Sequence, residues 1–147
     1  MAKILIMDDE PLSLRRLFNV LCVDRQHDIS TADDLPSGVK VVERLGTTLD
    51  VLIIDVSMFE TISVDLLPLF ANACPKATML VITPLVKRSL GWYPQLRKPF
   101  ADQEFVQAVN RVLAMPQCGV VEASARPKPP HSCRADGRLV QARALGR

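Results

Sequence analysis

The sequence predicts an α/β protein in which the strands of a parallel sheet alternate with helices. Several short apolar runs end abruptly in a polar residue, a pattern typical of strands that are buried on both faces of a sheet. Between these runs lie segments whose apolar residues recur at helical spacing. The chain has 147 residues, 48% of them apolar and 23% charged, which suits one compact core. Strands that alternate with helices imply right-handed crossover connections.

In the first half of the chain this pattern predicts two strands and two helices. In order, they are a strand over residues 4–7, a helix that begins at Pro11, a strand over 28–33 and a helix over 35–45. The first strand is a continuous apolar run that ends at Asp8. The first helix has one apolar face, made of Leu14, Leu17, Phe18 and Leu21. Gly46 follows the second helix and favours a left-handed cap at its end.

The second half of the chain continues the alternation. In order, we expect a strand over 51–54, a helix over 61–72, strands over 78–82 and 95–98, and a helix over 101–114. The run over 51–54 repeats the opening pattern and ends in an acid, Asp55, and the next run ends at Thr83. Pro68 lies inside the expected helix over 61–72 and should kink or divide it, because proline has no backbone N–H.

From residue 116 onward the sequence predicts a tail rather than a second core. Prolines and glycines interrupt it, so we expect one domain over residues 1–115 and a disordered tail or linker over 116–147. Residues 120–147 carry six basic and two acidic side chains, a net charge of +4, and the rest of the chain sums to −2. A basic tail is usually just solvated. Contact with nucleic acid or an anionic ligand stays open, because Arg134 and Arg138 are spaced to clamp phosphates.

Cysteine usage and hydropathy indicate a protein of the cytoplasm without a membrane span. The cysteines are Cys22, Cys74, Cys118 and Cys133. No two of them are spaced as a Cys-x-x-Cys pair, so neither a metal site nor a disulfide framework is indicated. The apolar run after Met1 is too short for a signal peptide, and no run approaches the ~20 apolar residues of a membrane span.

The polar residues that end the apolar runs form the candidate site. They are Asp8 with Asp9, Asp55, Thr83 and Lys98. Because the carboxyl ends of parallel strands meet at one edge of the sheet, these side chains should converge. Converging carboxylates repel each other unless a cation neutralises them, and oxygen ligands suit Mg²⁺. Taken singly, each acid is more often a helix cap. Taken jointly, the residues indicate a phosphoryl-transfer site.

This constellation resembles the receiver domains of response regulators in two-component signalling. The resemblance covers about residues 2–115 and includes Met58, three residues after Asp55, and Pro99-Phe100 after Lys98. It implies a flavodoxin-like fold, a doubly wound five-stranded parallel sheet with strand order 2-1-3-4-5 and helices on both faces. It also implies a phosphoacceptor signalling domain, which catalyses its own phosphoryl transfer and dephosphorylation and is not otherwise an enzyme.

The resemblance also implies a role for each residue of the site. Asp55 would be the phosphorylation site and would take the phosphoryl group from a sensor histidine kinase or a phosphotransfer protein. Lys98 would pair with that group, and Thr83 would hydrogen-bond it when the domain switches. The Lys98–Pro99 bond is often cis in this family. The implied Mg²⁺ ligands are Asp8, largely through water, and directly Asp9, Asp55 and the backbone carbonyl of Ser57.

Several residues depart from the usual receiver pattern. Phe59 and Ser63 replace a proline and a glycine after the phosphorylation site. Pro84 follows Thr83, where a small residue is usual, and Gln95 stands where an aromatic residue often reports the switch, a role that Tyr93 could take. Eleven residues, 84–94, join the fourth and fifth strands, against about 10–12 for a whole crossover. A shortened fourth helix, 85–90 at most, is therefore expected in a region that usually forms the output face.

Two other functions stay open. The departures favour a degenerate, receiver-derived docking module that binds a protein or nucleotide without being phosphorylated, whereas the five intact polar residues oppose it. A hydrolase with an aspartyl nucleophile would use the same acids and Mg²⁺, but no general acid or base follows Asp55 and no substrate-capping domain is present. The sequence identifies no output target.

Overall fold

The computed structural model describes residues 1–24, 26–59, 66–84 and 93–116. Along the chain the elements are β1 (Ala2–Met7), α1 (Pro11–Cys22), β2 (His27–Ala32), α2 (Leu35–Leu45), β3 (Val51–Asp55), the 3₁₀ turn η1 (Val56–Phe59), α3 (Leu66–Ala73), β4 (Thr78–Thr83), β5 (Gln95–Arg97) and α4 (Asp102–Ala114). Each predicted strand is present, with ends that differ by no more than two residues. The alternation expected from the apolar runs is therefore confirmed.

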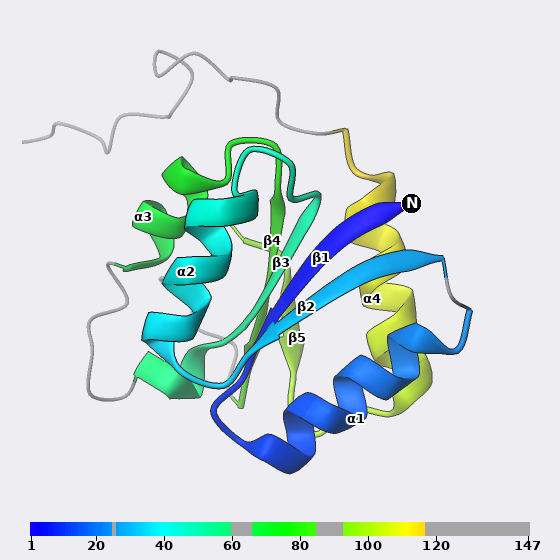
Figure 1. Ribbon diagram of the computed structural model, residues 1–147. Coiled ribbons are helices and arrows are strands. Elements are labelled where there is room, and N and C mark those ends of the chain that lie inside the picture. The colour runs from blue at the N-terminus through cyan, green and yellow to red at the C-terminus, as the bar shows by residue number, and fades with distance from the viewer. Residues whose placement is uncertain (25, 60–65, 85–92, 117–147) are drawn as a thin grey trace, which may run out of the picture.

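The five strands form one parallel sheet in the order β2-β1-β3-β4-β5 (Figure 1). This is the predicted strand order. The inner strands are covered on both faces, and all five residues of β3 are buried. A strand buried in this way has no solvent-facing side, which explains why its sequence is a continuous apolar run.

Helices cover both faces of the sheet, as Figure 1 shows, with α2 and α3 on one face and α1 and α4 on the other. Alternate residues of the same strand point to opposite faces. In β1, Leu5 and Met7 pack toward α2 and α3, while Ile4 and Ile6 pack toward α1 and α4. The sheet thus divides two apolar cores, and its strands are held from both sides.

The end of α2 differs from the prediction. Gly46 has φ −51° and ψ −41°, which is the right-handed region, so the expected left-handed cap was wrong. A Cβ at this position would lie 2.6 Å from the carbonyl oxygen of Ala73 at the end of α3. It would also lie 2.5 Å from the carbonyl oxygen of Val42. Glycine is needed here because two helix ends approach closely, not because of its backbone freedom.

Some predictions fall on residues that the structure does not describe. These are the shortened fourth helix within 85–92, the first part of the helix over 61–72, and the tail from residue 117. In the described part of the third helix, α3 runs through Pro68 without interruption.

Cys22 and Cys74 are free, and burial raises the pKa of the Cys74 thiol to about 11. In the described ranges no helix combines the length and apolarity of a membrane span.

Candidate functional site

The register of the sheet brings the predicted site residues to one edge. Met7 of β1 lies beside Ile54 of β3, so Asp8 and Asp55, the next residues, lie at the same level. Asp55 ends β3 and Thr83 ends β4. The side chains of Asp8, Asp55 and Thr83 are fully buried. Buried polar groups in this number are unusual for a core, because each must find a partner there.

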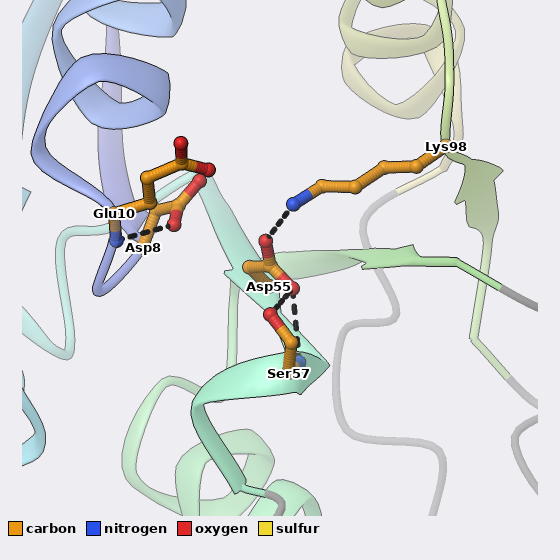
Figure 2. A network of polar contacts seen from close by, with 5 residues as sticks. All are labelled: Asp8, Glu10, Asp55, Ser57 and Lys98. Carbon is orange, nitrogen blue, oxygen red and sulfur yellow. Dashed lines mark hydrogen bonds and ion pairs between the residues drawn. The ribbon is translucent and has the colours of Figure 1, made fainter.

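Asp55 is held through both of its carboxylate oxygens. The backbone N–H of Ser57 donates to Oδ1 over 2.9 Å, and the Ser57 hydroxyl donates to the same oxygen over 2.6 Å. Lys98 Nζ pairs with Oδ2. Figure 2 shows Lys98 and Ser57 approaching Asp55 from different sides. The carboxylate therefore has one fixed orientation at the end of β3.

Lys98 enters the site from the loop after β5. Its backbone N–H donates to the carbonyl oxygen of Thr83 over 2.9 Å, and the Lys98–Pro99 peptide bond is cis, as expected. Partial burial by itself lowers the pKa of the Lys98 ammonium. The hydrogen bond and charge of Asp55, with smaller effects of Asp8 and Glu10, outweigh burial and raise that pKa. Lys98 is therefore a cation held among acids.

Asp8 is a buried acid whose two carboxylate oxygens have different surroundings. Its Oδ1 accepts a hydrogen bond from the Glu10 N–H over 2.9 Å, whereas its Oδ2 is buried without a hydrogen-bond partner (Figure 2). Burial, and to a smaller degree the charge of Asp55, raise the pKa of the Asp8 carboxyl, although the Ser13 hydroxyl, the Glu10 N–H and Lys98 act the other way. An unpartnered buried carboxylate oxygen is a position where a cation fits.

A hard divalent cation suits this donor set. Mg²⁺ prefers oxygen ligands and usually takes one or two carboxylates while it keeps several waters. Asp8, Asp55 and the carbonyl of Ser57 supply such oxygens. Within the described ranges no three acidic, histidine or cysteine side chains gather as ligands of one metal ion. Waters would therefore complete the coordination.

Asp9 occupies a different place from its neighbour. Its side chain is exposed, and within the described residues no hydrogen bond or ion pair joins it to Asp55 or Lys98. Its direct role as a ligand stays a prediction. Of the two adjacent acids, the structure brings Asp8 rather than Asp9 into the buried cluster.

Asp8→Asn should stabilise the metal-free fold at pH 7 by about 1 kcal/mol. Because the folded-state pKa of Asp8 is raised, its charged form opposes folding, and stability falls as the pH rises through that pKa. An uncharged amide removes this effect. The measurement is urea unfolding of both proteins, with Asp28→Asn, an exposed position, as the control. Mg²⁺ should stabilise the unmodified protein more than Asp8→Asn. Equal stabilisation of both would place the cation elsewhere.

Two contacts at the site were not predicted. The Ser57 hydroxyl donates to Asp55, a contact that was not among the roles expected for this residue. Arg16 of α1 contacts the loop that carries Lys98. Neither residue follows an apolar run, so the strand-end pattern gave no signal for them.

Among the departures from the receiver pattern, Pro84 is exposed beside Thr83, and Tyr93 packs against the core under α2 and α3. Ser63 lies outside the described residues.

No protein-family model and no curated protein matches the chain. Its structure is similar to a response regulator receiver domain protein from Clostridium thermocellum, with 26% sequence identity over 77% of this chain and 94% of that one, and a TM-score of 0.66. The chemotaxis protein CheY4 of Vibrio cholerae is 21% identical over 76% of this chain and 98% of its own, with a TM-score of 0.65. A response regulator from Thermotoga maritima is 17% identical over 77% and 98%, also with a TM-score of 0.65. The resemblance predicted from the strand-end residues is therefore confirmed, and the described part of this chain has the fold of a response-regulator receiver domain.

Proposed function

We propose that this domain is a phosphorylation switch that accepts a phosphoryl group on Asp55 in a Mg²⁺-dependent reaction. The observation that carries the proposal is the buried Asp55 carboxylate, which Lys98 and Ser57 hold at the sheet edge where Asp8 also has a buried oxygen without a hydrogen-bond partner. A carboxylate that only capped a turn would not need a partly buried lysine partner and a second buried acid. The similarity to receiver domains supports a signalling role.

In the proposed reaction a carboxylate oxygen of Asp55 forms a bond to phosphorus while the bond between phosphorus and the donor breaks. For a phosphohistidine donor, the imidazole nitrogen leaves with the bonding electrons. Lys98 offsets the charge on the transferring oxygens, and the Thr83 hydroxyl can donate a hydrogen bond to one of them. Asp8, Asp55 and the Ser57 carbonyl would hold Mg²⁺, which would supply further charge neutralisation. The protein contributes mainly orientation and electrostatics.

The donor proposed for this reaction is a sensor histidine kinase or a phosphotransfer protein. Its phosphohistidine would have to approach the edge of the sheet where β1, β3 and β4 end. The proposed reaction would take place in the cytoplasm, which is the compartment expected from the sequence. The product is an acyl phosphate on Asp55, and we propose that the domain acts by changing its surface in that state.

Acetyl phosphate tests the proposal without a cognate kinase. With Mg²⁺ present, intact-mass measurement should show one added phosphoryl group per chain, and peptide mapping should locate it at Asp55. Removal of the metal by a chelator should slow uptake about 100-fold, because the acids are then less compensated.

The alternative hypothesis is a receiver-derived docking module that is not phosphorylated. It predicts a folded protein that binds Mg²⁺ and takes no phosphoryl group from acetyl phosphate or from a purified histidine kinase. That combined result would overturn the phosphorylation switch.

A further inference from the structure

One side chain of α1 makes three contacts with the segment that follows Lys98. Arg16 donates from Nη2 to the carbonyl oxygen of Phe100 over 3.0 Å and from Nε to Oδ1 of Asp102 over 2.6 Å. Its guanidinium also lies over the Phe100 ring, 5.5 Å from the ring centroid. A planar guanidinium suits this use, because its fork of N–H donors can serve two acceptors at once while its face covers a ring.

The segment has few other polar anchors. Pro99 has no N–H to donate, and α4 begins after Ala101 without a side-chain cap. Among the described residues, the other backbone bonds near it run from Lys98 N–H to Thr83 and from Phe105 N–H to Ala101. The Phe100 ring stacks on the fully buried Phe105, with centroids 6.0 Å apart. Arg16 therefore supplies polar contacts to the middle of a segment whose other polar contacts lie at its ends.

The loop contacts of Arg16 bear on the position of Lys98, because part of the lysine side chain borders a cavity. A cavity of about 370 Å³ borders Lys98 and Phe100 and is lined as well by Glu10, Ser13 and Arg16. On this side the stem of Lys98 borders open space instead of packed side chains. The position of Lys98 is therefore set by its ion pair with Asp55 and by the backbone of its loop. Arg16 ties this loop to α1, where the neighbouring Leu17 is buried in the core.

The contact contributes little to folding. The side chains of Arg16 and Asp102 are 49% and 59% exposed, and ion pairs this exposed add little to stability because water screens them. A contact that is nearly neutral for stability can still matter for reactivity, because small displacements of a group that stabilises transferring charge cost large factors in rate.

We propose that Arg16 is a positioning residue that holds the loop of residues 98–102 so that Lys98 Nζ stays at the carboxylate of Asp55. This inference rests on the proposed phosphorylation of Asp55 and identifies a further residue that sets its rate. Arg16 touches neither Asp55 nor the incoming group. It acts through Phe100 and Asp102.

Arg16→Met tests the proposal, with Arg15→Met as the matched control on the same helix. Arg16→Met should lower the maximal rate of phosphorylation by acetyl phosphate about tenfold, with the half-saturating donor concentration and the thermal unfolding midpoint nearly unchanged. Hydrogen exchange of the amides in residues 98–102 should accelerate. Arg15→Met should change none of these quantities. Arg16→Lys should rescue the rate only in part, because an ammonium lacks the fork.

A double variant separates positioning from a general structural role. In a Lys98→Ala background, Arg16→Met should have no further effect on rate, because the group that it positions is gone. Additive losses, a fall in rate that follows a fall in unfolding midpoint, or unchanged amide exchange would each overturn the inference. If the unmodified protein takes up no phosphoryl group at all, the proposed function fails instead. The exchange comparison would then show separately whether Arg16 holds the loop.

Discussion

Asp55→Asn should reduce phosphoryl uptake to background, a loss of more than about 1000-fold, because a neutral amide has no anionic oxygen to attack phosphorus. The amide has nearly the shape of the carboxylate, and its oxygen can still accept both hydrogen bonds from Ser57. Its NH₂ group, however, would face the ammonium of Lys98, where donor meets donor. The variant should therefore fold, lose the ion pair and stay unmodified. Intact mass after incubation with acetyl phosphate and Mg²⁺ is the measurement.

Asp28→Asn is the control for this result. It removes the same charge from an exposed position on β2 and should be phosphorylated like the unmodified protein. A phosphoryl group on Asp55→Asn, at the same stoichiometry, would show that another residue is the acceptor.

Lys98→Ala should slow phosphoryl transfer about 100-fold at saturating Mg²⁺ and donor, a loss typical when one preorganised electrostatic contact to a transition state is removed. The same change leaves the buried Asp55 without its cation and removes the smaller effect of the Lys98 charge on Asp8. Mg²⁺ binding should therefore be kept or become tighter, since a competing positive charge is gone. Initial rates and a separate metal titration measure the two effects.

A control variant and a charge-retaining variant test the Lys98→Ala prediction further. Lys76→Ala, at an exposed position between α3 and β4, should leave both quantities unchanged. Lys98→Arg should retain the charge but bring a wider, planar group to Asp55 and recover only part of the rate. If Lys98→Ala loses Mg²⁺ binding together with phosphorylation, the lysine is needed to organise the acids rather than to stabilise transferring charge.

The sequence predicted the fold well because its inner strands are buried on both faces. Such strands must be continuous apolar runs, and their polar end residues then mark the edge of the sheet. Asp8, Asp55 and Thr83 were found in this way, and the register places them together. Lys98 was found as the residue that ends the last predicted strand, although that strand ends one residue earlier, at Arg97.

The remaining details depend on geometry that has no periodic signal. Nothing in the pair Asp8-Asp9 says which acid is buried, because the chain leaves the strand there and the alternation of faces ends. The Ser57 hydroxyl reaches Asp55 only through the shape of the 3₁₀ turn. Gly46 could be recognised as a helix end, but the approach of Ala73 that requires it comes from a separate helix.

The Arg16 contacts span nearly the whole domain, since 84 and 86 residues separate Arg16 from Phe100 and Asp102, and 43 separate Lys98 from Asp55. Contacts between residues so far apart in sequence form late and slowly. During synthesis the two acids leave the ribosome well before the lysine that compensates them. The cluster is therefore incomplete until residues 98–102 have emerged, and the phosphorylation proposed for Asp55 would require nearly all of the domain to have been translated.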